Sequence, residues 1–415
     1  MPDQTRHIAF FLPTFPAGGQ EHTTLLLMKG LVERGHRVDL LLERKVGAYL
    51  PRVPETIPIH ELKRRSRWSG YRRLIPGWPS EGFRHLRGSL GLGQRSIPLH
   101  RLIALVDYME TQRPDVVISA HDRAPLLAIW AAGIARRRVA TIVIEHSLFS
   151  YNRAAAQHDN RTAARMQRHE VLMRRLYPLV DARVAVSRAA GEDLADVIGM
   201  PHEAVSRIYN PVVSAELACL AEHPIDDAWF APGAPPVILA AARLAPEKNL
   251  DVLIEAFAEL RHSGVDARLI LLGDGPERDT LCQRIDTLGL AAEIRLPGWV
   301  DNPYAWMRHS ALFVVSSAFE GLSNTLIEAM ACGCPVVSTD CPGGPREILQ
   351  DGRYGALVPV GDVGALAHAM RSTLSSPTDR NTLIARASDF AVDRAIDEYE
   401  ALIEGVCAAP DIPAA

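Results

Sequence analysis

Short apolar runs alternate along the first half of the chain with segments whose apolar residues recur every three or four positions. Buried strands are predicted at 7–13 (HIAFFLP), 37–43 (RVDLLLE), 115–120 (DVVISA), 140–145 (ATIVIE) and 182–187 (ARVAVS). The intervening periods predict helices, one from about Glu21 to Arg34 and another starting near Pro98. Strands that alternate with helices form a parallel sheet covered by helices on both faces.

A second series of the same kind occupies the rest of the chain. Its predicted strands are at 237–242 (VILAAA), 267–273 (ARLILLG), 293–298 (EIRLPG), 311–317 (ALFVVSS), 335–339 (PVVST) and 354–360 (YGALVPV). The pattern therefore predicts two doubly wound α/β domains in tandem, 1–210 and 211–390. The last helical segment, 391–407, follows the final strand, and we expect it to pack back on the first domain.

The bulk composition agrees with two globular domains. The chain has 415 residues, of which 47% are hydrophobic and 23% charged. No stretch approaches the roughly 20 apolar residues that span a bilayer, and the start lacks the features of a signal peptide. We therefore expect a cytoplasmic protein. The six cysteines follow no disulfide or zinc spacing, and Cys332 and Cys334 are interpreted as small buried thiols.

The net charge of −4 hides a strong asymmetry between the two halves. Residues 1–210 carry 31 Lys+Arg and 20 Asp+Glu, and residues 211–415 carry 14 and 29. Much of the positive excess lies in a segment at 63–95, where nine basic residues are mixed with aromatic ones. This composition favours peripheral contact with an anionic membrane, although a solvated basic loop or a nucleic-acid contact would also fit it.

Ligands of open parallel sheets bind beyond the carboxyl ends of the strands. Two cations, Arg243 and Lys248, follow the strand 237–242 and suit a diphosphate, although Arg243 could instead pair with a nearby carboxylate and Lys248 could be a surface residue in the first turn of a helix. His121 follows another strand and could contact a sugar or a phosphate. Gly18 and Gly19 precede a helix and allow close approach of a ligand to the backbone, but a plain turn fits equally well.

The segment 316–340, SSAFEGLSNTLIEAMACGCPVVSTD, places two glutamates around a turn. Glu320 is predicted in the loop after a buried strand, and Glu328 lies one turn into a mainly apolar helix. Because buried carboxylates need hydrogen-bond donors, and sugar hydroxyls are such donors, we expect one glutamate to bind a sugar and the other a ribose.

These motifs together resemble glycosyltransferase family 4, whose members are retaining nucleotide-sugar transferases of the GT-B fold. The spacing from Glu320 to Glu328 (EGLSNTLIE) resembles the E-x7-E motif of that family. The segments GGPREIL, GDGPE, ARLAPEKNLDVLIEAF and GGQEHTTLLLMKGLVERGHRVDLLL are also similar to family segments. The resemblance covers nearly the whole chain. Within the family, the sequence resembles most the bacterial enzymes that build surface polysaccharides. It implies two Rossmann-like domains that face each other across a cleft.

The resemblance also implies roles for individual residues. Arg243 and Lys248 would bind the donor diphosphate, Glu328 the ribose and Glu320 the transferred sugar. His121 would be the histidine of the catalytic cleft. Donor contacts would also come from backbone groups of Gly18, Gly19, Gly273, Gly321, Leu322 and Ser323. The family usually needs no metal, so we expect neither metal nor cofactor, and the sequence has no D-x-D pair at a strand end.

The implied activity is retaining transfer from a nucleotide-sugar, with UDP preferred over GDP, to a lipid-linked or polysaccharide acceptor. We expect this at the inner face of the cytoplasmic membrane, with the segment 63–95 making the contact and without a nucleic-acid partner. The alternatives are a nucleotide-sugar epimerase, a transferase with a soluble acceptor, and a non-catalytic subunit that binds nucleotide-sugar.

Overall fold

The computed structural model describes residues 5–62, 99–121 and 123–408. The chain forms two compact units. Unit 1 comprises the described residues up to Tyr209 and those from Ala395 onwards, and unit 2 is Asn210–Arg394. The segment 63–95, for which the sequence predicts membrane contact, lies outside the described residues.

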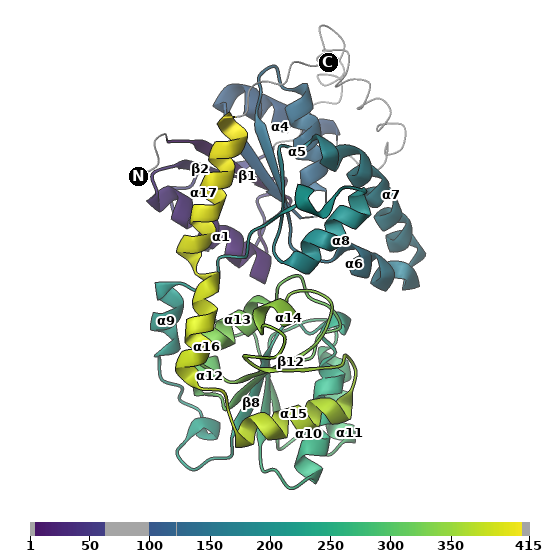
Figure 1. The fold of residues 1–415 in the computed structure, drawn as a ribbon, viewed down its shortest axis with the longest axis vertical. Helices are drawn as coiled ribbons and strands as arrows, with labels where there is room; N and C mark the ends of the chain where they lie inside the picture. Colours follow the sequence, from purple (N-terminus) through teal and green to yellow (C-terminus); the bar gives the residue numbers. More distant parts are fainter. Residues whose placement is uncertain (1–4, 63–98, 122, 409–415) are drawn as a thin grey trace. The chain divides into compact units, whose positions relative to one another are not determined.

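Unit 1 contains a seven-stranded parallel sheet in the order β3-β2-β1-β4-β5-β6-β7 (Figure 1). Its strands are β1 His7–Leu12, β2 Arg37–Leu42, β3 Ile59–Glu61, β4 Val116–Ala120, β5 Ala140–Glu145, β6 Ala182–Ala185 and β7 Ser206–Arg207. Its helices are α1 Gly19–Glu33, α4 Leu99–Gln112, α5 Ala124–Ile134, α6 Phe149–Ala155, α7 Asn160–Leu176 and α8 Arg188–Ile198. Its short 3-10 segments are Leu50–Arg52, Ala156–His158 (η2), Tyr177–Leu179 (η3) and His202–Ala204.

Unit 2 repeats this architecture with six parallel strands in the order β10-β9-β8-β11-β12-β13. Its strands are β8 Val237–Ala241, β9 Arg268–Leu272, β10 Ile294–Gly298, β11 Leu312–Val315, β12 Val336–Thr339 and β13 Ala356–Val358. Its helices are α9 Ala215–Ala221, α10 Leu250–His262, α11 Arg278–Thr287, α12 Pro303–His309, α13 Asn324–Ala331, α14 Pro345–Ile348, α15 Val363–Ser375 and α16 Arg380–Ala387. Its 3-10 segments are Ala228–Phe230, Pro246–Lys248 (η6) and Ser388–Phe390. The prediction of two doubly wound α/β domains is confirmed.

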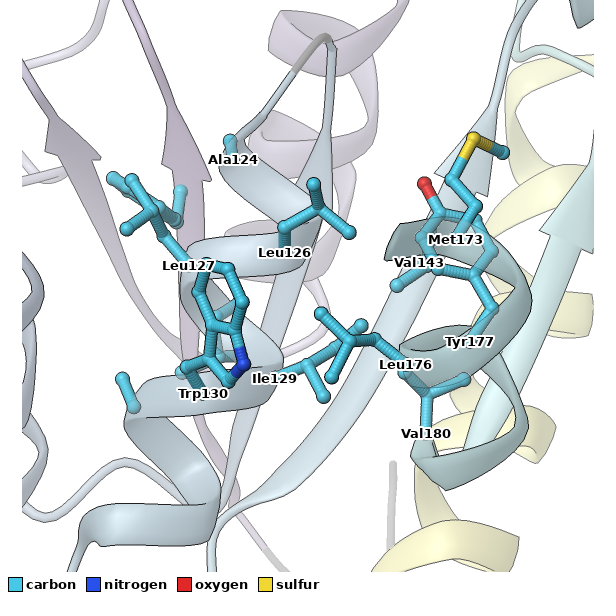
Figure 2. Packing of buried hydrophobic residues seen from close by; sticks show 14 of the residues in the cluster. Ala124, Leu126, Leu127, Ile129, Trp130, Val143, Met173, Leu176, Tyr177 and Val180 are labelled. Carbon is cyan, nitrogen blue, oxygen red and sulfur yellow. The ribbon is translucent and has the colours of Figure 1, made fainter. Parts of the chain in front are cut away.

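Central strands form where the sequence is continuously apolar, because helices cover both faces of each sheet. Every residue of β1 is buried, and β1 pairs in parallel with both β2 and β4. Each unit has its own apolar core. Figure 2 shows part of the core of unit 1, where side chains of α5 such as Leu126 and Ile129 lie near Leu176 and Tyr177.

The last helix, α17 Val392–Ala408, contacts the first part of the chain within unit 1. The Arg6 guanidinium lies 2.6 Å from the Glu404 carboxylate, and Arg34 lies 3.0 Å from Glu400. A Cβ added at Gly30 would lie 1.9 Å from the Cδ1 atom of Ile396, so α1 and α17 touch closely at this glycine. Because the chain from Asn210 to Arg394 belongs to unit 2, the part of α17 from Ala395 onwards completes unit 1 after the chain has formed unit 2.

Candidate active site

In each unit the strand order reverses beside the first strand, between β1 and β4 in unit 1 and between β8 and β11 in unit 2. Loops that leave two strands in opposite directions open a crevice at such a point. The candidate residues of unit 2 follow β8 and β11, and those of unit 1 follow β1, β4 and β5.

In unit 2, Lys248 lies at the end of η6 and meets the loop that follows β11. Its Nζ atom lies 2.7 Å from the Oε1 atom of Glu320, and the two side chains are 20% and 13% exposed. The Ser317 hydroxyl donates to the same carboxylate oxygen at 2.6 Å. Lys248 is therefore half-buried and paired with a carboxylate, and its contact with a diphosphate stays a prediction. Glu320 holds the ammonium group in place at the carboxyl edge of the sheet.

The backbone also joins these two loops. The Ser316 hydroxyl donates to the carbonyl oxygen of Lys248 at 2.7 Å, and the amide of Ala318 donates to that of Glu247 at 2.8 Å. Lys248 is therefore positioned by backbone contacts as well as by its ion pair. Arg243, by contrast, is 68% exposed and pairs with Glu247 four residues away, as the alternative interpretation of this arginine expected.

The turn at 321–323 connects β11 to α13 and has a strained backbone. Ser323 has φ = 73°, a left-handed conformation that is uncommon for residues other than glycine. Its hydroxyl oxygen is buried and has no hydrogen-bond partner among the described residues. A Cβ at Gly343 or Gly344 would lie 1.7 Å or 2.3 Å from the carbonyl oxygens of Glu320 and Leu322. The absence of a side chain at these two glycines therefore allows their loop to pack directly against this turn.

Glu328 lies on the buried side of α13 and is 8% exposed. Burial alone raises the pKa of its carboxyl to about 7. No hydrogen bond to its side chain is formed by any residue of the described ranges. A buried carboxyl of this kind favours ligand hydroxyl groups as donors, since otherwise its ionised form is poorly solvated.

Gly273 is packed against the backbone of two neighbouring segments. It has φ = 124°, its amide donates to the carbonyl oxygen of Gly298 at 2.9 Å, and a Cβ there would lie 1.9 Å from the carbonyl oxygen of Ala242. Only glycine fits between these strand ends. The adjacent Trp299, which the sequence analysis did not select, is 57% exposed at the end of β10.

In unit 1, the structure brings together His121, Glu21 and His146. The Nε2 atom of His121 lies 3.6 Å from Oε1 of Glu21, and the two imidazole rings are stacked at 5.9 Å with an interplanar angle of 26°. His121 has φ = 69°, so its backbone is also in the left-handed region. Gly18 precedes α1 and Gly19 begins it, and a Cβ at Gly18 would lie 2.5 Å from Oε2 of Glu21.

Two carboxylates, the buried Glu21 and the half-buried Glu145, belong to the same loops as these histidines or to the helix beside them. Glu21 is 7% exposed, and burial raises its pKa. Burial also raises the pKa of Glu145 to about 7, although the amide and hydroxyl of Ser147 donate to its carboxylate at 3.2 and 2.9 Å. The sequence analysis did not select Glu21 as a site residue. The first turns of α1 have the polar sequence GQEHTT, so no local pattern marked Glu21 as a buried residue.

The structure gives no support to a metal or membrane-spanning element in the ranges it covers. No group of three or more His, Cys, Asp or Glu side chains within 5–62, 99–121 and 123–408 could bind a metal ion. Cys332 and Cys334 are buried free thiols, and burial raises the pKa of Cys332 to about 12. None of the helices described is both long and apolar enough to cross a bilayer.

Two family models match consecutive parts of the chain. The model described as "Glycosyltransferase Family 4" matches residues 17–216, and the one described as "Glycosyl transferases group 1" matches 223–390. Together they account for both units.

Several curated proteins are similar to part of the chain. One is the Campylobacter jejuni N-acetylgalactosamine-N,N'-diacetylbacillosaminyl-diphospho-undecaprenol 4-alpha-N-acetylgalactosaminyltransferase, which is 32% identical over 50% of this chain and 54% of its own. Another is the lipopolysaccharide core biosynthesis glycosyltransferase LpsE of Rhizobium meliloti, 36% identical over 39% of this chain and 46% of its own. The matches thus span about half the length of these curated relatives.

Solved structures match the whole fold. HepE of Anabaena, in complex with UDP and glucose, has a TM-score of 0.73 at 22% identity, and the match covers 96% of this chain and 100% of that one. WaaG, a glycosyltransferase of lipopolysaccharide biosynthesis, has a TM-score of 0.64 at 14% identity, with 96% and 98% covered. These structures show the GT-B fold. On the two family models, which together match 17–216 and 223–390, the chain belongs to glycosyltransferase family 4.

Proposed function

We propose that this protein is a retaining glycosyltransferase that moves a sugar from a UDP-sugar to a lipid-linked or polysaccharide acceptor. The observation that carries the proposal is the Lys248–Glu320 pair, at 2.7 Å, at the carboxyl edge of the unit 2 sheet, together with the buried Glu328 on α13, the helix that follows the loop of Glu320. A cation held in place suits a diphosphate, and a buried carboxyl to which no described residue donates a hydrogen bond suits a ribose. The similar proteins that act on polyprenyl-linked or lipopolysaccharide acceptors support the acceptor class.

Each candidate residue then has a defined part in donor binding. Lys248 and Arg243 bind the diphosphate, for which Arg243 exchanges its contact with Glu247. Glu328 accepts hydrogen bonds from the ribose, and the buried Ser323 hydroxyl together with backbone groups of 321–323 contacts a phosphate or the sugar. Gly273 shapes the adjoining loop by its contact with Ala242 and Gly298. The indole of Trp299, two strands from β8 and so about 10 Å away, offers a stacking surface for the base.

In the proposed reaction the cations stabilise the leaving diphosphate, and no side chain of the protein attacks the sugar. The acceptor hydroxyl attacks the anomeric carbon from the face that the nucleotide leaves. The bond from that carbon to the diphosphate oxygen breaks, and this oxygen takes the proton of the acceptor hydroxyl. Lys248 and Arg243 stabilise the negative charge that develops on the diphosphate. His121 and the amides that follow Gly18 contact the transferred sugar or the acceptor. The basic segment 63–95 is proposed as one contact with an anionic membrane.

The test is calorimetric titration of the protein with UDP and GDP in parallel, with Arg243→Ala/Lys248→Ala as the control, followed by incubation with labelled UDP-sugars. We expect UDP to bind, the double variant to lose that binding, and label to move to a polyprenyl-diphosphate glycan. Conversion of the donor sugar without an acceptor would identify an epimerase instead. Binding without turnover across donors and acceptors would identify a non-catalytic subunit. In the same titration, Trp299→Ala should weaken UDP but leave pyrophosphate unchanged, and equal effects would exclude stacking.

Glu328 predicts a specific dependence on pH. Its folded-state pKa of about 7 lies above the usual 4.5, so burial favours the protonated carboxyl. The free energy of unfolding should therefore fall as pH rises from about 4.5 to about 7, by a few kcal/mol at most. Donor affinity should rise over the same range, because the ionised carboxylate accepts both ribose hydroxyls.

Glu328→Gln removes both dependences. The measurement is titration of a UDP-sugar from pH 5 to 8, with thermal unfolding alongside, and the control is Glu216→Gln on the exposed side of α9. A UDP-sugar is preferable to UDP because its phosphodiesters keep a constant charge over this range. If Glu328→Gln and the wild type have the same slope, Glu328 does not bind the ribose.

A further inference from the structure

A hydrogen bond between two asparagines connects the start of unit 2 to the start of α13. The Nδ2 atom of Asn210 donates to the Oδ1 atom of Asn324 at 2.9 Å, and the two residues are 114 positions apart in the sequence. Asn210 is the first residue of unit 2 and is 7% exposed, and Asn324 is the first residue of α13. Because a buried amide costs free energy when it is unpaired, this contact holds the two segments together.

Asn210 is itself held in place by the segment that follows it. Pro211 restricts the backbone of the residue before it to extended conformations. The amide of Val213 donates to the carbonyl oxygen of Phe390 at 3.0 Å, and the amide of Val392 donates to the carbonyl oxygen of Val213 at 3.0 Å. Asn210 therefore belongs to a fixed backbone and can position the residue to which it donates.

The start of α13 needs a contact of this kind. A serine before a helix usually accepts from one of the first helix amides and so fixes the helix start. Ser323 precedes α13 but has a left-handed backbone, and its side chain makes no such capping hydrogen bond. Asn210 instead contacts the residue directly after Ser323.

The turn 321–323 has the features of a phosphate contact. Its backbone leads into the first amides of α13, and amides at the start of a helix attract phosphate oxygens. The Ser323 hydroxyl is buried in the same turn, in a residue that is 6% exposed, and it has no hydrogen-bond partner among the described residues. A displacement of Asn324 would move both groups, because it is the next residue along the chain.

Glu328 should be less sensitive to such a displacement. It lies one turn further into α13, where neighbouring residues such as Ile327 and Ala329 are buried in the core. Loss of the contact at Asn324 should therefore disturb the groups that bind phosphate more than the carboxyl that binds the ribose.

We propose that Asn210 is a positioning residue of the donor site, which acts through Asn324 to hold the turn 321–323 in the shape that binds the donor diphosphate. The inference rests on the proposed function, because it takes this turn as part of the donor site. Asn210 itself does not touch the donor.

The test is a double-mutant cycle of Asn210→Ala, Asn324→Ala and the two together, measured by calorimetric titration with UDP and with uridine. Asn210→Ala should weaken UDP binding by about threefold to tenfold, the usual effect of one lost hydrogen bond, and uridine binding hardly at all. The double variant should bind UDP no more weakly than the weaker single variant, because both changes remove the same contact.

The matched control is Asp379→Ala, which loosens α13 at its other end. The Asp379 carboxylate accepts from the amide of Thr382 at 2.9 Å and so caps α16. Arg380 of α16 donates to the carbonyl oxygen of Cys332, directly after α13. Asp379→Ala should lower the unfolding temperature, as Asn210→Ala should, but should leave UDP affinity unchanged.

Two results would overturn this inference alone. Unchanged UDP affinity in Asn210→Ala, while Arg243→Ala/Lys248→Ala loses UDP, would make the asparagine contact purely structural. Equal weakening of UDP and uridine, or additive losses in the cycle, would mean that Asn210 does not act through the turn. If the wild type binds GDP instead of UDP, the same comparison with GDP and guanosine decides the inference, and only the choice of donor nucleotide fails. A wild type that binds neither nucleotide would contradict the proposed function and this inference together.

Discussion

Lys248→Ala should weaken UDP binding by about thirtyfold to a hundredfold and uridine binding hardly at all. The Lys248 ammonium is held 2.7 Å from Glu320 and by backbone contacts of its loop, so it is placed for the diphosphate before the donor arrives. A charge-assisted contact of this kind contributes about 2–3 kcal/mol, or one and a half to two powers of ten in affinity. The measurement is calorimetric titration with UDP, pyrophosphate and uridine. Only the ligands with phosphates should lose affinity.

The matched control is Lys45→Ala, because Lys45 is an exposed lysine of unit 1 for which no ligand contact is proposed. Thermal unfolding separates a lost contact from a damaged site, since Lys248→Ala also leaves the partly buried Glu320 with only its Ser317 donor. Lys248→Ala/Glu320→Gln removes that unpaired charge. If the double variant regains stability but not UDP affinity, Lys248 binds the diphosphate itself. Unchanged UDP affinity in Lys248→Ala would remove Lys248 from the donor site.

The architecture was predictable because its signals are local and repeated. Strands such as β1 and β8 are buried on both faces, so they are continuous apolar runs in the sequence. The edge strands β3 and β7 were not predicted. They are three and two residues long and partly or fully exposed, so neither has an apolar run. The break between α6 and α7, where Asp159 caps the start of α7, was also not predicted.

The site was predictable only as far as position after a strand defines it. That rule selected Lys248, Glu320 and His121, and the structure places each at the carboxyl end of its sheet. It could not reveal which side chains touch. The pairing of Lys248 with Glu320 joins residues 72 positions apart, and that of Glu21 with His121 joins residues 100 apart. Such contacts depend on the strand order, which local patterns do not determine.

Glu21 is expected to act in transfer through His121. Its carboxylate lies 3.6 Å from the His121 Nε2 atom in a buried setting, close enough to orient the imidazole but longer than a hydrogen bond. His121→Ala should lower kcat about a hundredfold, because the sugar or acceptor loses a contact made in the transition state. Glu21→Gln, which keeps the shape and removes the charge, should lower kcat about tenfold. Neither should change UDP affinity, because the UDP contacts proposed here are in unit 2.

The control for Glu21→Gln is Glu33→Gln, an exposed glutamate on the same helix. Steady-state kinetics of both variants, and of Glu21→Gln/His121→Ala, form a double-mutant cycle. If Glu21 acts by orienting His121, the double variant should be no slower than His121→Ala alone. Additive losses would mean that Glu21 contacts the substrate directly. Equal kcat for Glu21→Gln and Glu33→Gln would mean that the burial of Glu21 serves only the fold, and that His121 is positioned by its strained backbone and its stacking on His146.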